Sequence, residues 1–216
     1  MRSYDEYCAI AKSLEVVGDR WTLLIVRELA LRGACRYTDL RNGLPGIATN
    51  LLAGRLRELE RAGVIAREDA PPPIATTLFK LTSRGEQLTP VLEDLTRWGV
   101  PLMTEQGPDD AVQGHWLAWA LELMLTDRDP TAPPVTLALD TADEAIVIEA
   151  GGGVVHTRLG SADGADVTLT GPPRPILGLL LGLLDLPEAT AKGITYQGDP
   201  AILARVGPEG VSGPTG

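Results

Sequence analysis

The feature that most constrains this chain is a succession of short helical patterns in residues 7–62, followed by two short alternating segments. Apolar residues at steps of three and four predict helices over residues 7–17, 20–31, a short stretch after Tyr37, and 49–62. Asp19, Thr38 and Thr49 are expected to act as caps, and Gly33 ends the second helix. Residues 64–67 and 77–81 alternate as strands around a proline-rich tip at residues 70–73. Helices followed by a hairpin predict a winged helix-turn-helix.

A longer apolar stripe follows the hairpin. Thr82 is predicted to cap one helix over residues 83–103, whose apolar residues share one face with polar residues opposite: Leu88, Leu92, Leu95 and Trp98. A stripe of this length favours packing against a partner helix.

The second half of the chain has a different composition. Up to residue 105 the chain holds 14 Lys+Arg and 14 Asp+Glu, and beyond it 5 and 15, so the net charge of −10 lies in the second half. This division indicates two domains, and it leaves nucleic acid open as a partner of the neutral half. We expect domains at residues 1–104 and 115–207, a linker at 105–114 and a flexible tail at 208–216.

The second half is predicted to be α+β with an antiparallel sheet. Apolar helices are expected at residues 115–125 and 175–184, with a closing helix at 200–206. Five strands are expected, at residues 135–139, 145–149, 154–159, 167–170 and 194–197.

The fourth helix carries the chemistry expected of a DNA reader. Its buried face holds Leu52, Leu56 and Leu59, and 100° per residue places four other residues on the opposite face: Asn50, Gly54, Arg57 and Arg61. A major groove admits one helix, an Asn amide can pair with adenine, and Arg can bind guanine or phosphate. Arg36, Thr38 and Arg41 are placed for phosphate contacts, as are the wing residues Arg67, Thr76, Thr77 and Lys80. Any one of these arginines alone is more often a solvated surface residue, whereas the combined pattern favours DNA.

A longer set of residues resembles one family of regulators. It comprises Tyr7-Cys8-Ala9-Ile10, Gly18-Asp19-Arg20-Trp21-Thr22-Leu23-Leu24-Ile25, Arg27-Glu28-Leu29, Arg36-Tyr37-Thr38-Asp39-Leu40, Leu44-Pro45-Gly46-Ile47 and Leu81-Thr82-Ser83-Arg84-Gly85. Residues 7–100 resemble the HxlR family of winged-helix transcriptional regulators. The resemblance implies a homodimer on an inverted-repeat operator, more often a repressor, with dimer contacts at Ile10, Leu14, Leu88, Leu92, Leu95 and Trp98.

The chain departs from the family pattern at two positions. Ala48 stands where the family usually has Ser, so Thr49 is the expected replacement cap, and Ala9 stands where it has Pro. Cys8 matches a cysteine that senses oxidants or electrophiles in some members, although a cysteine on a packed helix is more often a small core residue. Cys35 is a weaker candidate.

The second half resembles the sterol-carrier-like (SCP2-type) fold. The resemblance lies in Ala165-Asp166-Val167-Thr168-Leu169-Thr170-Gly171-Pro172, the following apolar helix, and Gly193-Ile194-Thr195-Tyr196-Gln197-Gly198-Asp199-Pro200. It implies an apolar tunnel for a hydrophobic effector, lined by Trp116, Trp119, Met124, Leu180 and Leu184, with His156 and Tyr196 as polar anchors. Ordinary core packing is the alternative for these apolar residues.

Other function classes find little support. Gly151-Gly152-Gly153 lacks the Lys-Ser/Thr of a phosphate loop and is better read as a hairpin turn. Two histidines, His115 and His156, two cysteines and no Gly-x-Ser-x-Gly motif argue against catalysis, a metal site or a cofactor. With no secretory signal and no membrane-length apolar run, we expect a cytoplasmic regulator. The alternative is a carrier of hydrophobic ligands that uses the winged helix only to dimerise.

Overall fold

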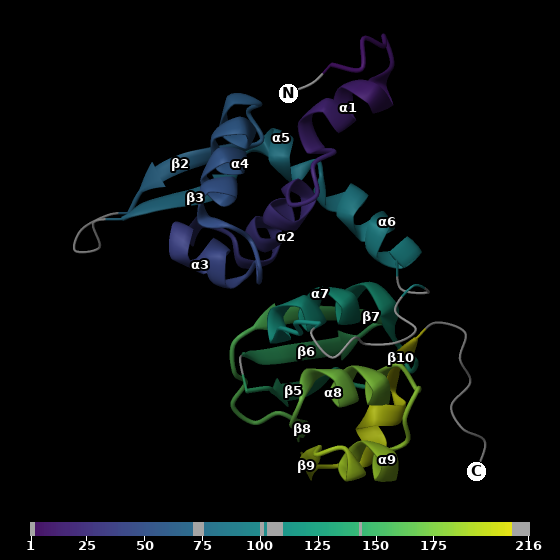
Figure 1. Ribbon diagram of the computed structural model, residues 1–216. Coiled ribbons are helices and arrows are strands. Elements are labelled where there is room, and N and C mark those ends of the chain that lie inside the picture. Colours follow the sequence, from purple (N-terminus) through teal and green to yellow (C-terminus); the bar gives the residue numbers. More distant parts are fainter. Residues whose placement is uncertain (1–2, 71–75, 100–101, 103–109, 143, 209–216) are drawn as a thin grey trace. The chain divides into compact units, whose positions relative to one another are not determined.

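The computed structural model describes residues 3–70, 76–99, 102, 110–142 and 144–208. The chain divides into two compact units, residues 1–103 and 104–216 (Figure 1). Parts of the expected wing tip, linker and tail, at residues 71–73, 105–109 and 209–216, lie outside the described residues.

The first unit is a helical domain with a small sheet. Its first four helices are α1 (Ala9–Val17), α2 (Thr22–Arg32), α3 (Tyr37–Asn42) and α4 (Thr49–Arg61). The short strand β1 (Cys35–Arg36) pairs with β3 (Thr77–Leu81), which pairs with β2 (Ile65–Asp69). Leucines on one side of α4 are buried with Ile25, Leu29 and Leu40 because the apolar period of each helix turns one face inward. The winged helix-turn-helix expected from the sequence is present.

Three predicted caps are wrong. Arg36 occupies the cap position of α3, and Thr38 lies within that helix. Trp21 rather than Asp19 occupies the cap position of α2, and the Asp19 carboxylate instead forms an ion pair with Arg55 of α4. Ala48 caps α4 without a side-chain hydrogen bond, and Thr49 is the first residue within the helix. Because a charged partner on a neighbouring helix competes for a carboxylate, local sequence did not determine the role of Asp19.

The helix expected over residues 83–103 is divided in two. Thr82 does cap its start, since its Oγ accepts from the Gly85 amide at 3.1 Å. That helix, α5 (Ser83–Glu86), ends after one turn, and α6 (Thr89–Gly99) follows. Pro90 lacks the amide that would donate to the carbonyl of residue 86, and its ring clashes with that carbonyl in a continuous helix. The proline therefore explains the break.

The second unit is a five-stranded sheet with helices on one face (Figure 1). Its strands are β5 (Val135–Asp140), β6 (Ala145–Gly151), β7 (Val154–Leu159), β8 (Val167–Thr170) and β9 (Thr195–Gly198). The helices α7 (Gly114–Met124) and α8 (Pro173–Leu180) pack their apolar faces on Leu137, Leu139, Ile146 and Leu169. These sheet residues alternate along their strands, which explains why one face forms the core.

The sheet is mixed rather than antiparallel, which corrects the sequence-based expectation. The order is β7-β6-β5-β8-β9, and β5 pairs with β8 in parallel, with Leu137 opposite Val167. A meander places β7 parallel to β5, and the chain must then cross back to begin β8 beside β5. Hydropathy specifies which residues alternate but not which strands become neighbours, so the sequence could not predict this pairing.

Three further elements were not predicted, and the closing helix takes a different form. The helix α9 (Leu186–Ala191) follows α8, and the strand β4 (Leu125–Asp127) pairs with β10 (Val206–Pro208). The expected helix at residues 200–206 is a single 3₁₀ stretch, η2 (Pro200–Ala204). Asp199 caps it by accepting from the Ala201 amide at 2.9 Å.

Candidate nucleic-acid interface

The helix-turn-helix consists of α3, the turn at residues 43–48, and α4. The Tyr37 hydroxyl donates a hydrogen bond of 2.8 Å to the backbone carbonyl of Thr49, which fixes the start of α4 against α3. Leu40, Leu44 and Leu52 are buried beneath this junction. The packing of three leucines and one inter-helix hydrogen bond therefore orients the outward face of α4.

Sequence reasoning missed a buried carboxylate below the same turn. Glu28 of α2 is fully buried, and its side chain lies against Gly43, where a Cβ atom would collide with the carboxylate. Arg27 donates to Glu28 at 2.8 Å, and Arg32 lies 3.5 Å from it. The pairing offsets the cost of burying the charge, and the absence of a Cβ atom at Gly43 leaves room for the carboxylate. The only sequence signal was an acidic residue on the inward face of an apolar helix.

The predicted outward row of α4 does face away from the core. Asn50, Arg57 and Arg61 are exposed, and the space beside Gly54 is open to 4 Å. Neither Arg57 nor Arg61 has a hydrogen bond or ion pair with any residue that the structure describes. The amide oxygen of Asn50 accepts from the Leu51 amide at 2.9 Å, so this side chain must rotate to pair with a base. Among the described residues, the guanidiniums of Arg57 and Arg61 are therefore unpaired charges on this face.

Polar residues at the start of α3 lie on the surface. Arg36 and Thr38 are exposed at the start of this helix, and Arg41 is exposed at its end. The Arg36 amide donates to the Asp39 carboxylate at 2.9 Å, which closes the first turn of α3. Thr49 is also exposed, at the first turn of α4.

The wing cations differ from those of α4 because they have acidic partners. Arg67 lies 3.1 Å from Glu60, and its guanidinium lies 5.4 Å from the centre of the Phe79 ring. Lys80 pairs with Glu68 across the hairpin. Thr77 donates a long hydrogen bond of 3.5 Å to Asp69. The acidic partners of Arg67 and Lys80 therefore reduce the positive charge that the wing can offer to phosphates.

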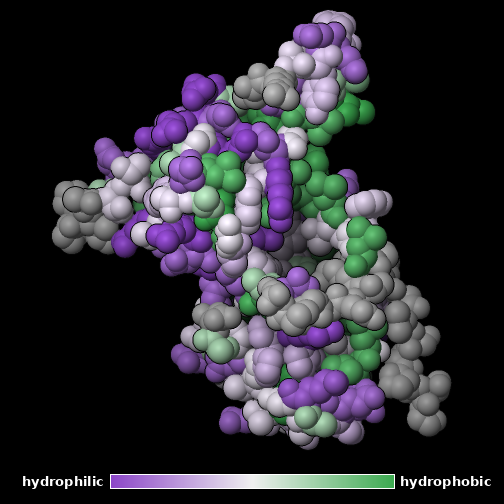
Figure 2. Space-filling model, viewed as in Figure 1, coloured by the Kyte–Doolittle hydropathy of each residue, from purple (hydrophilic) through white to green (hydrophobic). Residues whose placement is uncertain are grey.

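The helices α1 and α6 expose a set of apolar side chains in the first unit. Exposed fractions reach 71% for both Ile10 and Trp98, and Leu14 and Leu95 are also exposed. Hydrophobic side chains gather along α6 in the surface view (Figure 2). Leu92 is buried and Leu88 is half-buried, so the predicted stripe splits, with Leu92 turned toward its own domain.

The two cysteines occupy opposite environments. Cys8 is exposed at the start of α1, where hydrogen bonds from the amides of Ala11 and Ile10 lower the pKa of its thiol. Cys35 is buried in β1, and burial raises the pKa of its thiol to about 11. Only Cys8 combines exposure with stabilisation of the thiolate.

This contrast predicts selective labelling of the native chain. We expect iodoacetamide at pH 8 to alkylate Cys8 on the order of a hundredfold faster than Cys35, because reactivity follows the thiolate fraction. Peptide mass spectrometry over time measures both rates. Unfolding in denaturant should equalise them, and comparable rates in the native chain would contradict the described burial of Cys35.

The predicted ligand residues of the second unit do not surround a single site. His156 lies on β7 opposite Glu149, whereas Tyr196 lies on β9 opposite Leu169. These strands are opposite edges of the sheet, four spacings or roughly 19 Å apart, and the two side chains belong to opposite faces. His156 and Tyr196 therefore cannot anchor one ligand together. Leu180 is part of the core at 2% exposure.

Other members of that set lie near one helix. Trp116, Trp119 and Met124 of α7 are half-buried, and Leu184 packs against Gly178 of α8. The indole nitrogen of Trp119 is buried and has no hydrogen-bond acceptor among the described residues. His115, buried at the start of α7, lies 2.8 Å from Glu144.

Within the described ranges, no group of three or more His, Cys, Asp or Glu side chains could hold a metal ion. The same residues include no helix long and apolar enough to cross a bilayer.

The fold and the α4 surface define a winged helix-turn-helix protein with an accessory α+β unit. The sequence profile of the HxlR-like helix-turn-helix family matches residues 16–106. The uncharacterized HTH-type transcriptional regulator YvaP of Bacillus subtilis is 33% identical over 87 residues, which cover 40% of this chain and 80% of the relative. An uncharacterized HTH-type regulator of Methanothermobacter thermautotrophicus is 32% identical over 96 residues, 44% of this chain and 72% of the relative. The chain belongs to the HxlR-like helix-turn-helix family.

Among solved structures, the reduced form of the transcriptional regulator YodB from Bacillus subtilis is 26% identical, with a TM-score of 0.40. It covers 47% of this chain and 100% of that one. Family membership makes this chain a transcriptional regulator, and the prediction that it is not an enzyme is confirmed.

Proposed function

We propose that the chain is a cytoplasmic homodimeric repressor that reads an inverted-repeat operator with α4. The observation that carries the proposal is the pair of exposed guanidiniums, Arg57 and Arg61, on the same face as Asn50 and Gly54. This helix has 13 residues, about 20 Å of length, and a major groove accepts a helix of this kind. Because Arg57 and Arg61 are exposed and have no acidic partner among the described residues, their guanidiniums can bind phosphates or guanine.

The other candidate residues receive supporting roles in this proposal. Arg36, Thr38, Arg41 and Thr49 would hold phosphates beside the reading helix. Lys80 and Arg67 would add little, because acidic neighbours already balance them. Thr77 would contribute one polar contact from the wing.

Dimerisation is assigned to the exposed apolar side chains of α1 and α6. Ile10, Leu14, Leu95 and Trp98 supply surface that association would remove from water. Two α4 helices related by two-fold symmetry would read half-sites about one DNA turn apart, which is the reason for expecting an inverted repeat.

The second unit is proposed to be sterol-carrier-like and to bind an apolar effector. The order β8, α8, β9 and the capped Asp199-Pro200 turn support the fold assignment. The unpaired indole N–H of Trp119 supports an effector that carries a hydrogen-bond acceptor near Trp116 and Met124. Effector binding would shift the population of DNA-binding arrangements of the dimer. Cys8, exposed and with a lowered thiol pKa, is a second input under this proposal.

The proposal is tested by selecting random DNA duplexes with the purified full chain at moderate salt. Enrichment of a two-fold symmetric motif is the expected result, and failure to enrich any motif, with or without apolar ligands added, would overturn it. The carrier reading, in which the winged helix only dimerises, predicts no enriched motif and is disfavoured by family membership.

A further inference from the structure

Gly54 lies in the middle of α4, on the face that points away from the core. Its φ is not positive, and a Cβ atom built at this position would meet no other atom within 4 Å. Glycine weakens the interior of a helix relative to alanine, because it loses more backbone entropy on folding. Among the described residues, neither the backbone conformation nor the packing therefore requires a glycine here.

Most other glycines of the first unit have an identifiable structural reason. In one group a Cβ atom would come within 2.5 Å of another atom, and in a second group φ is positive, which L side chains rarely adopt. The first group is Gly18, Gly43 and Gly85, and the second is Gly33, Gly46 and Gly63. Gly99 has open space around it, but it is the last residue of α6, and helices commonly end near a glycine. Gly54 is thus the one described glycine of this unit that lies inside a helix without such a reason.

The exposed residues one turn before and one turn after Gly54 are those proposed to read DNA. Asn50 precedes it by four residues and Arg57 follows it by three, so they flank it at about 6 Å and about 4.5 Å along the helix axis. Between these two side chains the helix presents bare backbone. Base pairs are spaced by about 3.4 Å, so the distance from Asn50 to Arg57 corresponds to roughly three base-pair steps.

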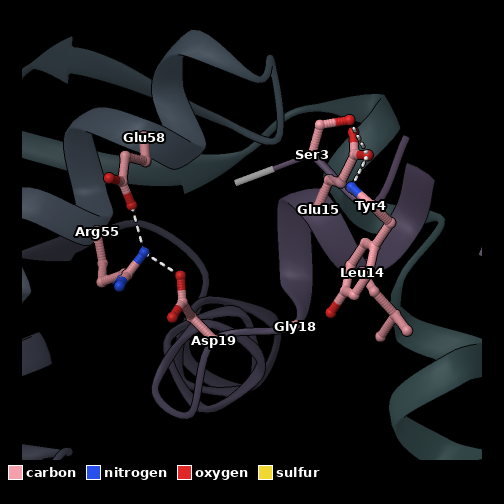
Figure 3. A pocket seen from close by; sticks show the side chains of 8 residues that line it. All are labelled: Ser3, Tyr4, Leu14, Glu15, Gly18, Asp19, Arg55 and Glu58. Carbon is pink, nitrogen blue, oxygen red and sulfur yellow. Dashed lines mark hydrogen bonds and ion pairs between the residues drawn. The ribbon is translucent and has the colours of Figure 1, made fainter. Parts of the chain in front are cut away.

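The position of α4 within the first unit is fixed by contacts on its other sides. Arg55, the residue after Gly54, pairs with Asp19 between α1 and α2 and with Glu58 of its own helix (Figure 3). The Tyr37 hydroxyl donates to the Thr49 carbonyl at the start of α4. Because α4 is held at these points, an atom added to its outward face cannot be accommodated by a shift of the helix alone. The whole unit would have to move away from the groove.

We propose that Gly54 is a specificity-determining residue, at which the backbone of α4 contacts base edges in the major groove. A side chain at this position would hold α4 away from the bases. Asn50 and Arg57 would then lose their hydrogen bonds to base edges, which weaken steeply beyond about 3.2 Å. Contacts of Arg36 and Arg41 with phosphates would persist, because attraction between charges depends less on geometry. The inference rests on the proposed operator binding and adds the residue that sets the depth of α4 in the groove.

Parallel selection of random DNA duplexes by the native full chain and by Gly54→Ala tests the proposal. We expect the variant to lose base preference at about three consecutive base pairs of each half-site, the stretch between Asn50 and Arg57. Its affinity for the duplex that the native chain enriches most should fall at least about tenfold. Its affinity for a duplex of the same length that is not enriched should change less than about twofold. An unchanged motif, or equal losses on both duplexes, would overturn the inference.

The stability of the first unit distinguishes this role from damage to the fold. Alanine is the better helix former, so Gly54→Ala should raise the urea midpoint of the first unit by about 0.3–1 M while it lowers selectivity for DNA. A lowered midpoint would overturn the inference, because the loss of binding would then reflect a damaged helix.

Gly99→Ala is the matched control, since it makes the same change at another open helix position, on α6. It should select the native motif, and loss of that motif in this variant as well would overturn the assignment to Gly54. If the native chain itself enriches no motif, the proposed operator binding fails and the inference fails with it. A native motif that Gly54→Ala retains rejects the inference alone and leaves the proposed function intact.

Discussion

Arg57→Ala is expected to abolish specific operator binding while the fold remains intact. Arg57 is exposed on α4 and contacts no described residue through a hydrogen bond or ion pair, so its removal creates no buried charge or cavity. A side-chain contact to a base is worth about 1–3 kcal/mol of discrimination, roughly five- to 150-fold, and a dimer would lose two such contacts. Fluorescence anisotropy with a labelled operator at fixed salt measures the change, and circular dichroism verifies folding.

Two other variants that each remove one positive charge serve as matched controls for the loss of operator affinity. Arg158→Ala removes a guanidinium from the second unit, where it lies 3.4 Å from Glu149, and should leave operator affinity unchanged. Lys80→Ala should have a smaller effect than Arg57→Ala because Glu68 already balances its charge. If Lys80→Ala weakened binding as much as Arg57→Ala, the wing rather than α4 would carry the recognition.

Arg205→Ala should destabilise the second unit by about 3–5 kcal/mol, the range for breaking a buried ion pair. The Asp127 side chain is fully buried and accepts from Arg205 at 2.7 and 3.0 Å. Arg205 also donates to the carbonyls of Ala132 and Pro133, which ties the loop after β4 to the end of η2. Without Arg205, the carboxylate keeps only the weaker amide donors of Asp129 and Gly153.

Urea unfolding of the full chain measures this effect through the transition of the second unit. Arg158→Ala is the control, since its ion pair is half-exposed and contributes at most about 1 kcal/mol. Pairing Arg205→Met with Asp127→Leu removes both charges together and should recover part of the lost stability. A native-like transition for Arg205→Ala alone would show that the pair is not needed for the second unit.

The same ion pair predicts how stability depends on acid. The hydrogen bond from Arg205 is the main reason that the pKa of Asp127 falls from 3.8 to about 2. A lowered folded-state pKa stabilises the fold above the unfolded value, so this contribution, ~2 kcal/mol, is present above pH 4. It should disappear as the pH falls from about 4 to 2, and the Asp127→Asn variant should lack this component in urea titrations.

Local sequence was sufficient to predict those features that depend only on residues a few positions apart. The apolar period of α4 fixed which side holds Leu52 and Leu56 and which side holds Arg57, because a helix repeats every 3.6 residues. The prediction that Thr82 caps a helix was correct because its hydrogen-bond donor, the Gly85 amide, lies only three residues away. The strands of the second unit were located by their alternation.

Side-chain roles that depend on distant partners could not be predicted in this way. Asp19 was expected to cap α2, yet Arg55 lies 36 positions later and takes its carboxylate. Lys80 was expected to contact phosphates, but Glu68 on the opposite strand of the wing already pairs with it. His156 and Tyr196 were expected to be polar anchors for one ligand. The strand order places them on opposite edges of the sheet. Each of these outcomes requires knowing which segments become neighbours.

The sequence by itself determined the winged helix, the outward face of α4 and the division into a neutral and an acidic half, because periodicity and composition are local properties. Only the tertiary structure decided the parallel pairing of β5 with β8, the buried pair of Asp127 and Arg205, and the ion pair of Asp19 with Arg55 (Figure 3). Charges and strand edges interact with whatever lies nearest in space, and that neighbour is set by the packing of the whole unit.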